Sequence, residues 1–222
     1  MPRALVTLPD RDARLAEASI EACYANTDLE WRLTQIPADA MCRGAFFNML
    51  DDRAATLSAE TQEEYRRFFR VHRFSPFRMY PVADYVTRMV VLAQVHYGAA
   101  SIHRGLRELQ SGAFDAWAGT LLGRAALALV EPSLASVLHM LQRAYASETV
   151  VSHSRFTVVS ASPEEIVTRF EREHNYVEHS MVGALEGVAR VCALDVELAA
   201  EMAGPFDGVV RIQIVGPREL SP

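Results

Sequence analysis

The sequence contains no lysine, so all 22 of its basic residues are arginine. This absence excludes a Schiff-base lysine and the lysine of a phosphate-binding P-loop, because both chemistries need an amine or ammonium side chain. It also means that the ion pairs of Asp and Glu, apart from those with histidine, are made by the planar, forked guanidinium group.

Cysteine is scarce, and the short motifs of common enzymes are missing. Cys23, Cys42 and Cys192 lie far apart and form no Cys-x-x-Cys pair, so neither a zinc ribbon nor a redox pair is indicated. There is no Gly-x-Ser-x-Gly elbow and no Gly-x-Gly-x-x-Gly loop. The densest group of possible metal ligands, at 171–179, matches no established zinc spacing. We therefore predict that the protein is not an enzyme and holds no metal or cofactor.

A basic surplus and a long uninterrupted hydrophobic run are absent as well. The net charge of −6 and the pI near 5.7 disfavour nucleic-acid binding driven by a positive field. The most apolar window, Ala113–Val130, contains Asp115 and Arg124, which favours a buried helix over a membrane span. The first residues lack the apolar run of a secretory signal. We expect a cytoplasmic protein with no nucleic-acid partner and no membrane span.

Apolar residues at helical spacing dominate the first two thirds of the chain. The expected helices are Asp12–Tyr24, Asp28–Gln35, Ala38–Leu50, Ala59–Val71, Pro81–Tyr97, Ile102–Leu109, Ala113–Val130 and Pro132–Ala146. Ser58 is a good N-cap for the fourth of these helices, and Gly98 is the expected end of the fifth.

After Ser147 the pattern changes. The β-branched runs Thr149–Ser152 and Arg155–Ser160 predict a hairpin, and Ser162-Pro163-Glu164-Glu165 predicts the start of a helix. The clearest unit follows at 179–215. It consists of a helix with Gly183 and Gly187 on one face and two alternating runs, each with one apolar and one polar face.

These patterns predict an α+β fold in which an N-terminal helical layer packs on a small, mainly antiparallel C-terminal sheet. The 222 residues suit a single domain. Within it we expect a loosely packed N-terminal segment at 1–36, a helical part at 37–147 and an α/β part at 148–216.

Four stretches of the chain carry a family resemblance. They are RGAFFNML at Arg43–Leu50, YPVADYVTRM at Tyr80–Met89, AWAGTLLGRAALAL at Ala116–Leu129 and GALEGVARV at Gly183–Val191. With these stretches, which are spread over most of its length, the chain resembles a family of paralogous proteins of unknown function that is expanded in myxobacteria.

More remotely, the C-terminal order of elements is similar to that of the vinyl-reductase-type, TRAPP-subunit and haem-NO-binding ligand domains. This resemblance implies a helical layer that holds a small apolar ligand or acyl chain against a short antiparallel sheet, often in a dimer, and it implies no catalytic residues. Haem-binding members carry a Tyr-x-Ser-x-Arg motif that contacts the haem propionates. The present sequence has no such motif, which speaks against a bound haem.

A pocket for a ligand is expected where the two most apolar helices face the sheet. Small residues among the large ones, such as Gly119 and Gly123, either leave room for a ligand or allow tight helix packing. Gly183 and Gly187 admit the same two interpretations. The candidate pocket residues are Phe114, Trp117, Leu121, Leu138 and Leu141.

The segment Arg66–Arg78 is a local exception to the acidic character of the chain, with five arginines and four phenylalanines. Its candidate anion- or partner-binding residues are Arg66, Arg70, Arg73 and Arg78. The competing interpretation is the end of an amphipathic helix, in which the phenylalanines are buried and the arginines pair with neighbouring acidic residues.

Two functional hypotheses follow. The first is a non-enzymatic small-molecule-binding or sensory domain that holds an apolar ligand and acts through protein partners or a homodimer; the resemblance at the level of fold supports it. The alternative is a protein-interaction or scaffold module without a small ligand, which would use the arginine-rich segment or an edge of the sheet.

Overall fold

The computed structural model describes residues 21–69, 73–131, 133–147 and 150–218. The helical elements come first. They are α2 (Leu29–Gln35), α3 (Gly44–Ala55), α4 (Ala59–Phe68), α5 (Val82–Tyr97), the 3-10 turn η1 (Ala99–Ser101), α6 (Ile102–Gln110), α7 (Ala113–Ala118), α8 (Leu121–Leu127) and α9 (Leu134–Ala146), with two short strands, β1 (Met41–Arg43) and β2 (Met79–Pro81), among them. The later elements are β3 (Arg155–Ala161), β4 (Glu165–Glu171), the π-helix η2 (Val177–Met181), α10 (Val182–Val191), β5 (Leu194–Gly204) and β6 (Asp207–Pro217).

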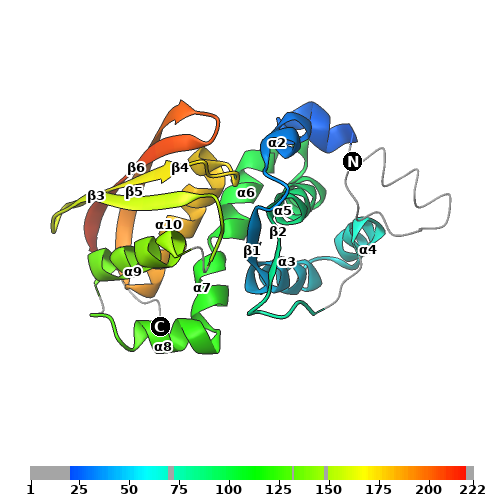
Figure 1. Cartoon of the computed structure of the whole chain (residues 1–222). Coiled ribbons are helices and arrows are strands. Elements are labelled where there is room, and N and C mark those ends of the chain that lie inside the picture. Colours follow the sequence, from blue (N-terminus) through cyan, green and yellow to red (C-terminus); the bar gives the residue numbers. More distant parts are fainter. Residues whose placement is uncertain (1–20, 70–72, 132, 148–149, 219–222) are drawn as a thin grey trace.

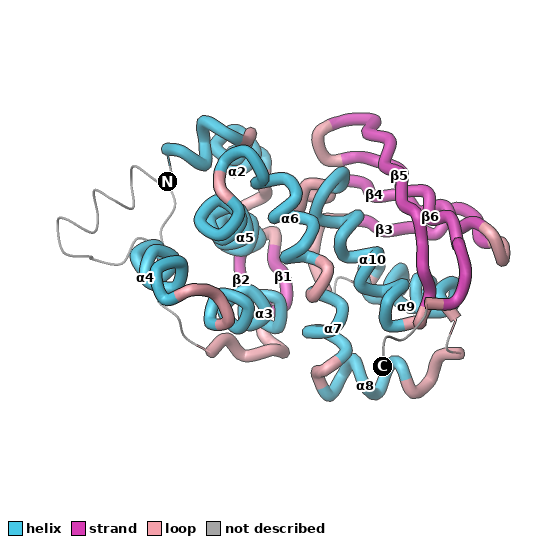
Figure 2. Tube along the Cα trace, turned by 180° about the vertical axis from the view of Figure 1, so that it is seen from behind, coloured by secondary structure: helices cyan, strands magenta, loops and turns pink. Residues whose placement is uncertain are grey.

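The four later strands form one antiparallel sheet in the order β3-β4-β6-β5. Helices α9 and α10 lie against this sheet, and α2 to α6 form the other side of the molecule (Figure 1). Helix α10 lies between α6 and the sheet and contacts both (Figure 2). The predicted α+β class, with helices on a C-terminal antiparallel sheet, is confirmed.

The β5–β6 hairpin follows the predicted alternation. Leu198 is opposite Ile212 in the register, and both point toward the helices, with Ile212 completely buried. Glu197 and Arg211 are exposed on the other face, where Arg211 lies 3.9 Å from a carboxylate oxygen of Glu201. Because side chains alternate along a strand, a slip of the register by one residue would turn this apolar face toward solvent.

The prediction of a helix that starts at Ser162 is wrong, because Glu165–Glu171 forms strand β4. The Ser162 hydroxyl does accept bonds from the backbone amides of Glu164 and Glu165, at 3.2 and 3.0 Å, but these bonds close the turn between β3 and β4. Ile166, Thr168 and Phe170 then alternate into the core. Their burial and the β-branched run favour a strand over the local capping signal.

The prediction of a hairpin between Thr149–Ser152 and Arg155–Ser160 is also wrong. Strand β3 pairs with β4 instead, and Val151 forms a bridge with Cys42 of β1. The backbone amide of Ser152 donates to Met41 O at 2.8 Å. The segment entering the sheet is therefore attached to the helical part, while Thr149 itself lies outside the described residues.

Two predicted helices differ most from the structure. The one expected from Ala38 starts only at Gly44, because Met41–Arg43 pairs with β2. The long helix expected at 113–130 is interrupted after Ala118, and α8 begins where the Thr120 hydroxyl accepts a bond from Gly123 N at 3.0 Å. A Cβ atom at Gly123 would lie 2.2 Å from Trp117 O, so this corner requires glycine.

The helical core is centred on α5, whose residues Val90, Val91 and Leu92 are completely buried. Both predicted helix ends are present. The Ser58 hydroxyl accepts a bond from Thr61 N at the start of α4, and Gly98 ends α5 with φ of 74°. A second apolar core lies between the sheet and α7, α9 and α10, and Phe46 and Tyr145 pack against both cores.

Residues 21–36 pack more closely than the sequence predicts. Cys23 and Leu29 are completely buried, and Arg32 of α2 is 2% exposed. Most of the helix expected at Asp12–Tyr24 lies outside the described residues. In the part of the chain that the structure describes, no helix is long and apolar enough to cross a membrane.

Candidate functional site

A cavity of about 60 Å³ lies in the second core, next to α10. Helix α10 and the residue before it contribute Met181, Ala184, Leu185 and Val188 to its wall. These positions follow helical spacing and so form one face of the helix. Met181, the last residue of the π-helix, thus connects the cavity to the turn that precedes α10.

The opposite face of α10 explains its two glycines. A Cβ atom at Gly183 would lie 2.0 Å from Arg107 O, and one at Gly187 would lie 2.1 Å from Ser111 O. Both contacts are to backbone atoms in or just after α6, and real Cβ atoms do not approach so closely. Of the two interpretations of these glycines, tight helix packing is therefore confirmed.

Aromatic rings form much of the remaining wall. Phe156 of β3 and Phe170 of β4 are register partners with ring centroids 5.0 Å apart. Phe114 and Trp117 of α7 lie on the cavity as well, with their centroids 5.5 Å apart. The wall is mainly apolar and suits an apolar guest.

Gln110 and Tyr145 add polar groups to this wall. The Gln110 carbonyl oxygen accepts the Tyr85 hydroxyl at 2.6 Å. Burial raises the pKa of Tyr145 well above its usual value, and the carboxylate of Glu173 raises it further. Tyr145 therefore remains a neutral hydroxyl at any physiological pH.

The predicted pocket residues divide into two groups. Phe114, Trp117 and Leu141 line the cavity. Leu138 is completely buried in the same core but does not line it, and Leu121 is 69% exposed. The break after Ala118 explains the position of Leu121, because only a continuous helix would carry it onto the face of Trp117.

The described part of the arginine-rich segment exposes its arginines more than its phenylalanines. Of its predicted residues, Arg66, Arg73 and Arg78 are exposed, whereas Arg70 lies outside the described residues. Arg73 pairs with Asp52 at 2.7 Å, and Arg66 donates to Gln62 at 3.1 Å.

The phenylalanines of this segment have a structural role. Phe68, Phe69 and Phe74 are buried, while Phe77 is 52% exposed. The arrangement matches the amphipathic-helix interpretation more closely than a surface for bases or anions.

A run of buried polar residues precedes the π-helix, within the stretch 171–179 whose sequence shows possible metal ligands but does not predict their burial. Glu173 is completely buried, and burial raises its pKa to about 7 even though Asn175 and Arg32 lower it. Its neighbour His174 has a pKa lowered to about 4, mainly by burial. Glu173 Oε2 and His174 Nδ1 have no hydrogen-bond partner among the described residues.

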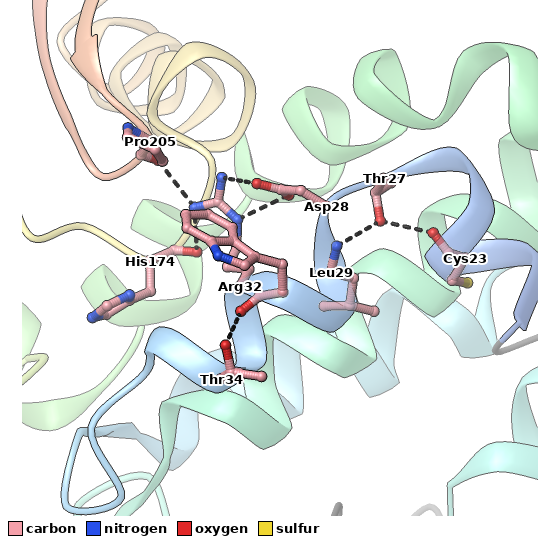
Figure 3. A network of polar contacts seen from close by, with 9 residues as sticks. Cys23, Thr27, Asp28, Leu29, Arg32, Thr34, His174 and Pro205 are labelled. Atoms are coloured by element: carbon pink, nitrogen blue, oxygen red, sulfur yellow. Dashed lines mark hydrogen bonds and ion pairs between the residues drawn. The ribbon is translucent and has the colours of Figure 1, made fainter.

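Arg32 of α2 connects the N-terminal helix to this run. Its Nη1 donates to His174 O and Pro205 O, both at 3.3 Å, and its other nitrogens pair with Asp28 (Figure 3). The guanidinium lies 3.9 Å from the ring centroid of Tyr176, a cation–π contact. The sequence signals only the Asp28–Arg32 spacing, because the other partners lie more than 140 positions away.

The architecture is shared with solved H-NOX proteins. An H-NOX protein from S. oneidensis in the Fe(II)NO ligation state has a TM-score of 0.62 and 12% identity, and the match covers 78% of this chain and 99% of that chain. An Fe(II) unliganded H-NOX protein from K. algicida has a TM-score of 0.55 and 13% identity, with 81% and 100% covered. An oxygen-binding H-NOX domain related to soluble guanylate cyclases has a TM-score of 0.56 and 12% identity, with 81% and 96% covered.

At these identities the likeness establishes the fold alone, and it agrees with the haem-NO-binding resemblance seen in the sequence. The chain belongs to the family described as Protein of unknown function (DUF2378), whose model matches residues 35–212. A comparison with curated proteins found no match.

The residues present do not fit a haem. None of the described residues around the cavity is a histidine or cysteine, and its volume of about 60 Å³ is well below the roughly 300–1,000 Å³ of pockets for ligands of comparable size.

Proposed function

We propose that this protein is a non-enzymatic sensory domain that holds a small apolar ligand in the cavity beside α10 and acts through a protein partner or a homodimer in the cytoplasm. The observation that carries the proposal is the apolar cavity between α10 and the sheet, in a fold shared with H-NOX proteins. The ligand would be held directly by the protein, since the lining does not fit a haem.

The cavity wall continues into the π-helix, which is suited to transmit the effect of a bound ligand to other parts of the protein. Met181 lines the cavity and ends the π-helix, and a single turn of this kind within a helix often marks a functional site. Tyr176, just before the π-helix, has a left-handed backbone with φ of 47° and lies against the Arg32 guanidinium. A ligand that displaces Met181 would therefore act on the contact between the π-helix and α2.

Filling the cavity tests this function. Ala184→Leu adds three carbon atoms to the cavity wall and should abolish ligand binding while the fold is retained. Purified protein would be titrated with small hydrocarbons and xenon, because an apolar cavity can bind such probes. Binding would be followed through the methyl NMR signals of Leu185 and Val188 and through the melting temperature.

Ala125→Leu provides the matched control, because Ala125 is exposed on α8 and away from the cavity. It should leave every ligand-induced shift unchanged. Wild-type protein that binds no probe would contradict the proposal, and so would an Ala184→Leu variant that binds as well as the wild type.

The scaffold alternative has weaker support. It would use the arginine-rich segment, but three of the four phenylalanines there are buried and unavailable to a partner. The exposed Arg66 and Arg73 are already paired with neighbouring side chains.

A further inference from the structure

Two polar groups on the cavity wall have unused hydrogen-bonding capacity. Gln110 uses its carbonyl oxygen for Tyr85, and its amide Nε2 makes no hydrogen bond to another described residue. The Tyr145 hydroxyl likewise has no hydrogen-bond partner among the residues that the structure describes, and both residues line the cavity. A guest that accepts a bond there gains about 0.5–1.5 kcal/mol per hydrogen bond in addition to the burial of its apolar surface.

The charges around the cavity decide which polar guest is suitable. None of the described lining residues is an arginine or a histidine, so nothing there would neutralise an anion. An anionic guest would lose its hydration without gaining a cationic partner, which disfavours carboxylic acids and phosphates.

We infer that the natural ligand is a small neutral molecule with an apolar body and one oxygen acceptor, such as a ketone, aldehyde or alcohol, whose oxygen binds Gln110 Nε2 and the Tyr145 hydroxyl. This inference rests on the proposed function and specifies the chemical class of its ligand. The hydrogen bonds fix the orientation of the guest, while the aromatic wall holds its apolar body.

The cavity volume limits the size of this ligand. An apolar cavity of about 150 Å³ accepts benzene, and the present cavity measures about 60 Å³. A guest of about four to six heavy atoms would therefore fit only with some movement of the wall. Met181 is suited to that movement, because methionine is unbranched and adapts its shape readily.

The test compares two probes with equal numbers of heavy atoms, cyclopentanone and methylcyclopentane, by NMR titration of the full chain. Gln110→Leu is made in a Tyr85→Phe background, so that no Tyr85 hydroxyl is left without its acceptor. Relative to Tyr85→Phe alone, Gln110→Leu should weaken cyclopentanone binding about five-fold and leave methylcyclopentane binding unchanged or tighter.

Tyr145→Phe is a second variant that removes only a hydroxyl without a partner and so should not disturb folding. It should also weaken cyclopentanone binding selectively. If both probes bind and every variant changes them equally, the inference is overturned while the proposed function stands. If neither probe binds the wild-type protein, both the inference and the proposed function fail.

Discussion

Arg88 and Arg32 are both almost fully buried, at 7% and 2% exposure, but they have different partners. Arg88 lies inside the helical part, where its Nη1 contacts Asp51 at 3.0 Å and Tyr65 at 3.4 Å, and Asp51 is itself 6% exposed. Arg32 pairs with Asp28, whose side chain is 39% exposed, and donates to two backbone carbonyls of the sheet part.

The difference separates a group that holds one core together from a group that joins two parts. If Arg88 is lost, Asp51 becomes a buried charge without its cationic partner, which is among the most costly defects in a protein. If Arg32 is lost, Asp28 can still be hydrated, and the cost is confined to two backbone bonds and the ring contacts. Two equally buried arginines therefore need not contribute equally to the stability of the fold.

The largest expected effect is that of Arg88→Met. The free energy of unfolding should fall by about 4 kcal/mol, because Asp51 loses its buried ion pair with Arg88. Urea denaturation measures the change. In the double variant Arg88→Met, Asp51→Leu, much of the loss should be recovered, since no buried charge remains. A single variant within 1 kcal/mol of the wild type would contradict the central role of this pair.

The burial of neither arginine was predicted from the sequence, but the local pattern comes closer to indicating it for Arg88 than for Arg32. Arg88 lies in a helix with a wide apolar face, next to buried positions, so its burial is a local consequence of the α5 pattern. The partners of Arg32 at 174 and 205 are brought close only by the complete fold. Local periodicity carries no information on such contacts.

The same distinction explains the other successes and errors. The β5–β6 hairpin was predictable because its alternation is a local pattern that tertiary contacts reinforce. Strand β4 was not predicted, because Ser162 gives a local capping signal for a helix. The strand forms because Ile166 and Phe170 pair with other strands of the sheet, and these contacts are not visible in the local pattern. Three of the five predicted pocket residues lie on the cavity wall. Leu121 does not, because the helix is interrupted after Ala118.

The second prediction concerns Glu173, which Arg32 influences electrostatically without the direct contact that Arg88 makes with Asp51. Its pKa is raised from 4.5 to about 7, so folding is favoured by its protonated form, and its contribution to stability is lost as the pH rises through about 7. Glu173→Gln abolishes this loss. From pH 4.5 to pH 7.5, the variant should gain about 3 kcal/mol relative to the wild type.

His174 makes the opposite contribution. Its pKa is lowered from 6.5 to about 4, so its stabilising effect is present above pH 6.5 and is lost as the pH falls toward 4. In the wild type the two contributions largely cancel between pH 4.5 and 6.5. Denaturant unfolding of Glu173→Gln and His174→Asn over this range should show opposite slopes, and parallel slopes would rule out the assignment.

The smallest effect, about 2 kcal/mol, is expected for Arg32→Met, which removes the bonds to His174 O and Pro205 O and the cation–π contact with Tyr176. The double variant Asp28→Asn, Arg32→Met is the matched control and should cost about as much as Arg32→Met alone, because it leaves no buried guanidinium without its carboxylate. Hydrogen exchange should accelerate mainly in α2 and in 173–181, since the clamp between the two parts opens locally while the Arg88 core remains closed. Uniformly faster exchange, or a loss of stability as large as that of Arg88→Met, would show that Arg32 supports the whole fold and does not merely join its two parts.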